Sequence, residues 1–300
     1  MKTMLALMRR NIKLFFKDKG MFFTSLITPL ILLVLYTTFL GNVFEDSVRQ
    51  AMGEAGGIIS DGLINGFVGG QLVSSLLAVS CVTVAFCANM LMVQDKFSGA
   101  RRDLTITPVK ASVLSLSYYI ATALVTLVIS LVALGACLIY IVNTGWYLSM
   151  SDVLYLILDV FLLSMFGTAL SSVVNFFLST QGQVSAVGSI VSAGYGFICG
   201  AYMPISSFGE GLQTVVSFLP GTYGTSLFRN HAMQGVFEAM EQDGLPQQVI
   251  DGLRDMTDCN PELLDHAVTV PQMYGILGGV TAVLVVVYIL QNKFLKKKMK

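Results

Sequence analysis

Long apolar runs separated by short polar segments dominate the chain. A helix needs about 20 apolar residues to cross the roughly 30 Å hydrocarbon core of a bilayer. Six runs reach that length, and each predicts a membrane-spanning helix. The predicted spans are 21–40, 67–93, 113–142, 153–178, 184–203 and 273–290.

A different pattern precedes the first run. Apolar residues recur there at helical spacing with basic residues between them, which predicts an amphipathic helix lying in the membrane interface over residues 1–20. The apolar positions are Leu5, Met8, Ile12, Phe15 and Phe16, and the basic ones are Arg9, Arg10, Lys13 and Lys17. A plain extension of the first span is the alternative. Residues 21–300 are predicted to form one transmembrane domain.

Composition supports the spans. Hydrophobic residues make up 54% of the 300 residues, charged residues only 12%, and the mean hydropathy is +0.73. A soluble protein of this size needs a larger polar surface. We therefore predict an all-α polytopic membrane protein with six transmembrane helices, surrounded by membrane lipids. The net charge of zero offers no basic domain for nucleic acid.

Basic residues predict the orientation. Of the 18 Lys and Arg residues, six precede the first span, four lie in the loop after the second, and five follow the last. Six alternating spans put all fifteen on one side, which is the cytoplasmic side by the positive-inside rule. Both termini are therefore expected in the cytoplasm, with the chain in the plasma membrane of a bacterial cell.

Motifs for catalysis are not found in the sequence. It contains neither a P-loop for ATP, nor a His-Glu-x-x-His zinc motif, nor a Gly-x-Ser-x-Gly nucleophile elbow. We expect no catalytic residues, no metal site and no cofactor on this chain. His231 and His266 lie outside the predicted spans without ligand spacing, and we expect both on the solvated surface.

The polar loop after the second span, residues 94–112, has the composition of a docking surface. It can form a short helix with charges of both signs, ending before Pro108 because residues that precede proline avoid helical angles. An acid, Asp95, is followed four residues later by Gly99, and then by Leu104 and Thr107-Pro108-Val109.

This order resembles the corresponding loop in the permease subunits of type-2 ABC exporters. The family usually has Thr after the glycine, where this chain has Ala100. The resemblance implies that the loop docks a separate ATPase subunit, which would carry the Mg-ATP. The docking residues would be Asp95, Lys96, Phe97, Gly99, Arg101, Arg102 and Asp103.

A second match follows the fifth span. The stretch 205–219 is too short to span and too apolar to float freely, so we expect a re-entrant or interfacial hairpin on the outer side. It resembles the outer hairpin of the same family, and its marker residues are Pro204, Pro220, Tyr223 and Arg229. The outer hairpin and the extracellular loop together cover 204–272. The acidic part of that loop is expected to be a solvated cap with a small helix over 246–256.

Candidate pathway residues lie in three spans. Asp159 is the charge well inside an apolar run, and it is either functional or close to the outer headgroups. Gly188, Ser192 and Gly196 repeat small residues every four positions in the fifth span, which favours close helix packing. The resemblance places that helix beside the pathway, between two permease halves. Gln71 and Ser74 of the second span either line a wet face or bond to neighbouring helices.

The resemblance implies a half-transporter that pairs with an identical or homologous permease chain and couples to ATPase subunits for export. A secondary transporter or channel is the main alternative, although that class usually shows several intramembrane charges or paired repeats. A membrane sensor or assembly subunit is the second alternative. The sequence does not identify a substrate.

Overall fold

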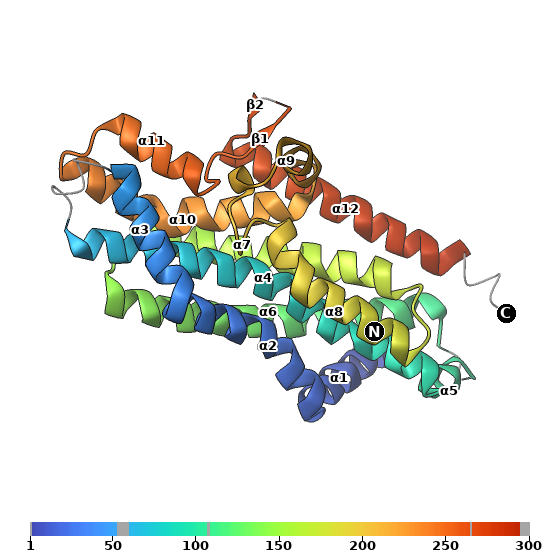
Figure 1. Cartoon of the computed structure of the whole chain (residues 1–300). Helices are drawn as coiled ribbons and strands as arrows, with labels where there is room; N and C mark the ends of the chain where they lie inside the picture. Colours follow the sequence, from blue (N-terminus) through green and yellow to red (C-terminus); the bar gives the residue numbers. More distant parts are fainter. Residues whose placement is uncertain (1, 53–59, 107–108, 265, 295–300) are drawn as a thin grey trace.

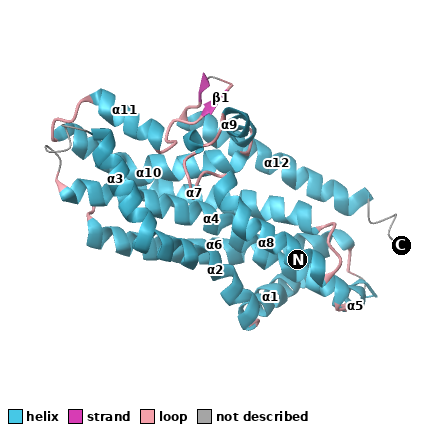
Figure 2. Ribbon diagram, in the orientation of Figure 1, coloured by secondary structure: helices cyan, strands magenta, loops and turns pink. Residues whose placement is uncertain are grey.

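The computed structural model describes residues 2–52, 60–106, 109–264 and 266–294, and most of these are helical (Figure 2). The helices are α1 (Lys2–Lys17), α2 (Lys19–Leu35), η1 (Tyr36–Leu40), α3 (Gly41–Met52), α4 (Asp61–Phe97), α5 (Ala100–Ile106), α6 (Ala111–Thr144), α7 (Met150–Asn175), α8 (Gln181–Ile198), η3 (Ile205–Ser207), α9 (Glu210–Ser217), α10 (Pro220–Gln242), α11 (Gln247–Met256) and α12 (Val270–Phe294). Strands β1 (Glu262–Leu263) and β2 (His266–Ala267) form a small antiparallel pair.

Five stretches of helix among the described residues are long and apolar enough to cross a membrane: Lys19–Gln50, Asp61–Phe97, Ala111–Thr144, Met150–Asn175 and Val270–Lys293. They confirm an all-α polytopic membrane protein and coincide with five of the six predicted runs. The fifth predicted run, 184–203, contains α8, which ends at Ile198 and is not among the five. That α8 crosses the membrane therefore stays a prediction.

The first crossing is one long helix with a local change of winding. α2 passes through η1, a π-helical turn, directly into α3. Pro29 lies inside α2. Membrane-spanning helices tolerate proline where neighbouring groups satisfy the backbone carbonyl that proline leaves without a donor. Tyr36 of the π-turn stacks on Phe44 with 5.7 Å between ring centres, and its hydroxyl lies 3.1 Å from the Ser75 hydroxyl of α4. The π-turn thereby fastens the first crossing to the centre of the bundle.

α4 is the central helix of the bundle (Figure 1). Every residue from Gly69 to Asn89 is buried, with α2, α6, α7, α8 and α10 packed around it. Its 37 residues span about 55 Å at roughly 1.5 Å per residue, which exceeds the roughly 30 Å hydrocarbon core. The bundle therefore extends beyond one face of a bilayer. We call its two ends the α5 end and the α11 end.

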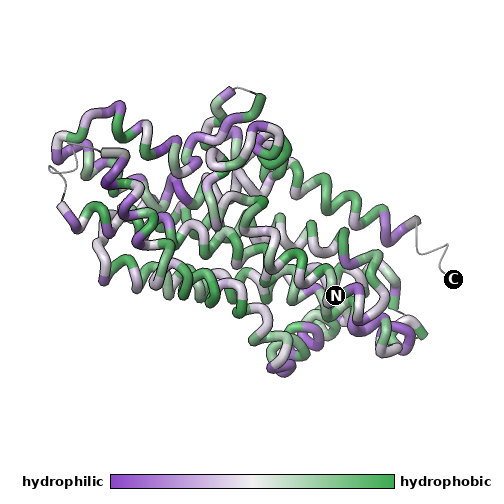
Figure 3. The backbone as a smooth tube through the Cα atoms, viewed as in Figure 1, coloured by the Kyte–Doolittle hydropathy of each residue, from purple (hydrophilic) through white to green (hydrophobic). Residues whose placement is uncertain are grey.

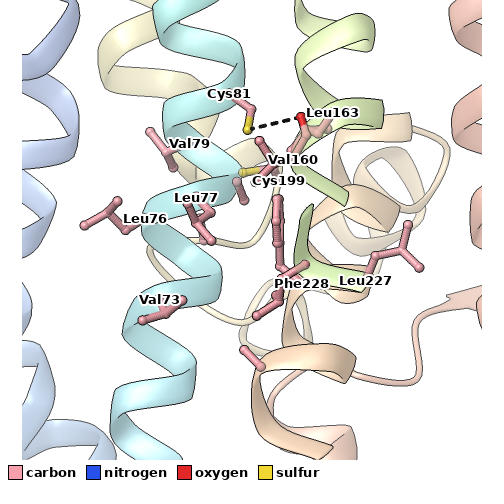
Figure 4. Close-up of a cluster of buried hydrophobic side chains, with 14 of the residues drawn as sticks. Val73, Leu76, Leu77, Val79, Cys81, Val160, Leu163, Cys199, Leu227 and Phe228 are labelled. Atoms are coloured by element: carbon pink, nitrogen blue, oxygen red, sulfur yellow. Dashed lines mark hydrogen bonds between the residues drawn. The ribbon is translucent and has the colours of Figure 1, made fainter. Parts of the chain in front are cut away.

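The packing at the bundle centre is close (Figure 4). Leu77 and Cys81 of α4 meet Val160 of α7 and Phe228 of α10 in one buried apolar cluster. Gly167 of α7 allows the close crossing with α4, because a Cβ there would lie 2.9 Å from the Cys81 carbonyl oxygen. A small residue at such a contact lets two membrane helices approach.

The α11 end has its own apolar core. Phe67 of α4 meets Met233 and Phe237 of α10 and Leu253 of α11 in a second buried cluster. The hydropathy colouring shows polar positions gathered at the two ends of the molecule and apolar ones along its length (Figure 3). α11 confirms the helix predicted over 246–256.

α10 corrects the prediction for the region after the fifth span. The expected hairpin is present only as η3 and α9, and the structure does not confirm that it re-enters the membrane. Pro220, Tyr223 and Arg229 instead belong to α10, a 23-residue helix packed against α4, α7 and α12. Residues Gly221–Met233 of this helix are all buried.

Candidate functional site

A long groove runs along the bundle between α2 and α8, with α4 as its floor. Its volume is about 1330 Å³. Asp18, Gln94 and Gln181 line it at the α5 end, and Ser47 and Ser206 line it at the α11 end. The groove therefore follows most of the length of α2.

The wall of the groove is mainly apolar with a few hydroxyl groups. Besides the serines at the α11 end, α2 contributes the hydroxyls of Thr24 and Thr28, and α8 those of Ser185, Ser189 and Ser192. Such a lining, with a small number of placed polar groups, is typical of sites that bind apolar or amphipathic ligands.

The predicted pathway residues separate into two groups. Gly188 and Ser192 line the groove. Gly196 lies on α8 against the ring of Tyr202, and any Cβ at this position would overlap that ring. Gln71 and Ser74 are fully buried in α4, away from the groove lining, and the Ser74 hydroxyl donates to the Gln71 carbonyl at 2.9 Å.

Asp95 occupies the last turns of α4 and is 5% exposed. Arg10 of α1 donates to both of its oxygens, from Nη1 at 2.6 Å and from Nη2 at 3.0 Å. The Tyr118 hydroxyl of α6 donates to Oδ2 at 2.5 Å. The hydrogen bonds from Arg10 to Asp95 raise the pKa of this guanidinium above its ordinary value. Asp95 therefore joins α1, α4 and α6 at the α5 end.

Lys96 is also engaged inside the chain. Its Nζ donates to the carbonyl oxygens of Asn175, Phe176 and Leu178 at 3.1, 2.6 and 2.8 Å. A cation at these carbonyls satisfies the unpaired acceptors at the end of α7. The side chains of Asp95 and Lys96 thus contact helices of this chain, and their predicted docking role stays a prediction.

The remaining docking candidates lie on the surface. Phe97 is 45% exposed, and Arg102 and Asp103 are exposed on α5, with Arg101 half-buried beside them. Gly99 connects α4 to α5 with a φ of +84°, in the left-handed region that favours glycine. Thr107 and Pro108 of the motif lie outside the described residues. α5 is therefore a short charged helix presented at the end of the central helix.

Gly99→Ala is expected to cost about 1 kcal/mol of local stability, because alanine is strained at this φ although a Cβ there has no neighbour within 4 Å. Amide hydrogen exchange in α5 should become faster. Gly182→Ala is the matched control, since a Cβ is also free there but φ is not positive. Equal exchange in α5 of both variants would contradict this account.

A buried ion pair lies where α10 meets the end of α8. Arg229, 1% exposed, donates from Nη1 to the Asp258 carboxylate at 2.9 Å and from Nη2 to the Gly200 carbonyl at 2.5 Å. Asp258 also accepts from the backbone N–H of Ile205 at 2.8 Å. Of the other predicted hairpin residues, Pro204 lines the groove and the Tyr223 hydroxyl donates to the Ser217 carbonyl at 2.6 Å.

Asp159 has partners that the sequence did not reveal. The Nδ1 atom of His231 lies 2.6 Å from Oδ2 of Asp159, and the Tyr274 hydroxyl donates to Oδ1 at 2.6 Å. The expectation that His231 is on the solvated surface is wrong, because the residue is only 9% exposed. Asp159 and His231 are 72 positions apart, so no local spacing could have paired them.

The long apolar helices are those of a multi-pass membrane protein. A family model described as ABC-2 type transporter matches residues 2–232, which is more than half of the chain. The chain belongs to the ABC-2 type transporter family. It is an ABC transporter permease and a transport domain rather than a catalytic one. Comparison with curated proteins found no match.

Proposed function

We propose that this chain is one half of the membrane pathway of an ATP-driven exporter. Its α5 end would face the cytoplasm, with both chain termini on that side, in the membrane of a bacterial cell. The basic residues of α1 and of the α5 region support this orientation. The nucleotide would bind to a separate ATPase subunit, since the sequence has no P-loop.

The observation that carries the proposal is the double role of α4. This helix contributes Cys87, Met90 and Gln94 to the groove floor and continues through Gly99 into the exposed α5. A force applied to α5 by an ATPase would therefore be transmitted through α4 to the floor of the groove. Arg10 and Lys96 would spread that force to α1 and α7 through their contacts at the same end.

Exposed apolar side chains line the open side of the groove, which supports the presence of a second permease chain. Ile31 on α2, Phe39 on η1 and Phe197 on α8 line it and are 54%, 62% and 52% exposed. A second copy, or a homologous permease, facing this groove would cover these residues and complete a pathway between the two chains.

The docking role of α5 is tested by charge reversal. Arg101→Glu/Arg102→Glu is expected to abolish copurification of an ATPase from the native membrane, because two cations on the presented helix become anions. Glu241→Lys/Asp243→Lys is the matched control, since it reverses two exposed charges at the α11 end. The measurement is ATPase activity in the affinity-purified complex.

Recovery of an ATPase with the wild type and the control, but not with the α5 variant, would support the proposal. Retention of the ATPase by the α5 variant would place the docking surface elsewhere. If the wild type itself recovers no ATPase in mild detergent, a secondary transporter or channel becomes the better reading.

A further inference from the structure

The groove between α2 and α8 has a polar half and an apolar half. In the half next to the α5 end, both walls carry hydroxyls, and these belong to Thr24, Thr28, Ser185, Ser189 and Ser192. Counted from Asp18 on the α2 side and Gln181 on the α8 side, all five lie within about 16 Å of that end, at roughly 1.5 Å per residue. The two walls therefore bring their hydroxyls to the same level of the groove.

The five hydroxyls of the polar half have no partner within the protein. Among the residues that the structure describes, none of the five takes part in a hydrogen bond. Hydroxyls of the same crossing that do not line the groove behave differently. Ser25 of α2 donates to the Phe22 carbonyl at 2.6 Å. Thr37 of η1 donates to the Leu33 carbonyl at 2.9 Å.

Thr28 shows most clearly that the polar half is suited to a ligand. The residue is only 6% exposed, and the surface that it retains lies in the groove. A hydroxyl that is withdrawn from water without a hydrogen bond costs free energy. A ligand with hydrogen-bonding groups at this level of the groove would recover that cost.

The rest of the groove is suited to hydrocarbon. Toward the α11 end the lining includes Ile31, Leu35 and Phe39 from the first crossing and Phe197 and Met203 from the α8 side. Tyr202 also lines this half, and its hydroxyl is directed to the Ser192 carbonyl, 3.5 Å away. Because Ile31 and Phe39 are more than half exposed, an apolar tail lying on them would bury their surface.

The charges of the groove favour an uncharged ligand. Asp18 is the one charged side chain among the described residues that line it. Its carboxylate lies at the α5 end and accepts from the Met21 N–H at 3.0 Å, which caps α2. A charged group between Thr28 and Ser189 would have no counter-charge, and such a charge at membrane depth is costly. Hydroxyl or amide groups can bond to the lining without this cost.

We propose that the groove binds an elongated amphiphile with an uncharged, hydrogen-bonding head and a long apolar tail. The head lies against Thr28 and Ser189, and the tail lies along Ile31 and Phe39 toward the α11 end. The volume of about 1330 Å³ exceeds the roughly 300–1,000 Å³ of common ligand pockets, which suits a molecule of lipid size. That this molecule is transported, enclosed by a second permease chain, rests on the proposed function, whereas its binding does not.

Two photoactivatable hexadecyl glucosides test the placement of head and tail. One has a diazirine on the carbon next to the sugar, and the other has it at the end of the tail. The full-length chain in phosphatidylcholine nanodiscs would be irradiated with each probe, and the labelled positions identified by peptide mass spectrometry. The first probe should label residues 21–28 and 184–192, and the second residues 31–44 and 197–203.

Three results of this experiment would overturn the proposal. The two labelling patterns could be exchanged, which would reverse the orientation of the ligand. Labelling of α12 equal to that of the groove would show dissolution of the probe in the surrounding lipid only. Absence of labelling in the groove would show that another occupant, such as a second copy of the chain, fills it.

Competition with unlabelled amphiphiles tests the chemistry of the head. At a concentration of hexadecyl glucoside that lowers groove labelling about tenfold, hexadecyl phosphate and hexadecyltrimethylammonium should lower it less than about twofold, because their heads are charged. Equal or stronger competition by either charged amphiphile would refute the uncharged head. This measurement uses the wild type and is independent of any variant.

Thr28→Val/Ser189→Ala tests the hydroxyls with little change of shape. Groove labelling at a subsaturating concentration of probe is expected to fall about tenfold, since two hydrogen bonds to the head are lost. Thr37→Val is the matched control and should be labelled like the wild type, because the Thr37 hydroxyl bonds its own helix and does not line the groove. Labelling of the double variant equal to that of the wild type would contradict the proposed site.

These measurements require no ATPase, so the two proposals can fail separately. Groove labelling without recovery of an ATPase would retain the amphiphile site and remove the ATP-driven exporter. Recovery of an ATPase without groove labelling would retain the exporter and remove the amphiphile as its ligand.

Discussion

Arg229→Ala is expected to destabilise the folded chain by about 3–5 kcal/mol, the range found when one partner of a buried ion pair is removed. Arg229 is 1% exposed and the Asp258 side chain 8% exposed. Without the guanidinium, the carboxylate keeps only backbone N–H donors and the Gly200 carbonyl loses its donor. Thermal unfolding in detergent, followed by the helical circular dichroism signal, should show the loss as a lower melting temperature.

A control variant separates the loss of the buried ion pair from the loss of stability that removal of any arginine would cause. Arg254→Ala deletes an arginine that is partly exposed on α11, and we expect a loss of about 1 kcal/mol or less. In Arg229→Met/Asp258→Asn no charge is left buried without a partner, so this double variant should recover part of the stability. A melting temperature of Arg229→Ala equal to that of Arg254→Ala would refute the account.

The sequence predicted the membrane spans well because the bilayer imposes a local requirement. Lipid offers no hydrogen-bond partners, so a crossing segment must be helical, long and apolar within a single stretch of chain. The structure confirms five such stretches, and α1 and α11 follow from their apolar spacing alone. α8 is not among the five, and four of its polar residues, Gln181, Ser185, Ser189 and Ser192, line the groove.

α10 could not be predicted in the same way. Its buried residues include Arg229, Asn230 and His231, which read locally as a polar loop. Their partners are 29 to 72 positions away, and only the folded bundle brings them together. These partners compensate the free-energy cost of burying the three polar side chains. The local sequence pattern holds no information about such distant partners.

Tertiary contacts also separate the predicted docking residues into an internal group and a surface group. The sequence correctly predicts a short helix after the second span, and the structure adds that α4 continues to Phe97 before α5 begins. Asp95 and Lys96 face inward because they bond to Arg10 and to carbonyl oxygens at the end of α7. These partners are 85 and about 80 positions away in the sequence. Such contacts leave no mark on the periodicity of the loop itself.

Arg10→Ala is expected to detach α1 from the α5 end at a cost of about 2 kcal/mol, the usual scale for hydrogen bonds to a charged group. Arg10 makes both of the bonds that hold α1 to Asp95, and its loss leaves that buried carboxylate with Tyr118. Amide hydrogen exchange in α1 should accelerate about thirtyfold if opening of this helix is limited by the lost bonds.

Arg9→Ala is the matched control, because it removes the same charge from the exposed position next to Arg10. It should leave exchange in α1 close to the wild type, which separates the loss of the contact from the loss of a basic residue facing the lipid headgroups. The exchanged pair Arg10→Asp/Asp95→Arg should recover part of the protection, since it restores opposite charges between α1 and α4. If Arg9→Ala and Arg10→Ala accelerate exchange equally, α1 is held by the membrane surface rather than by Asp95. The proposed transmission of force from α5 through α4 to α1 would then be wrong.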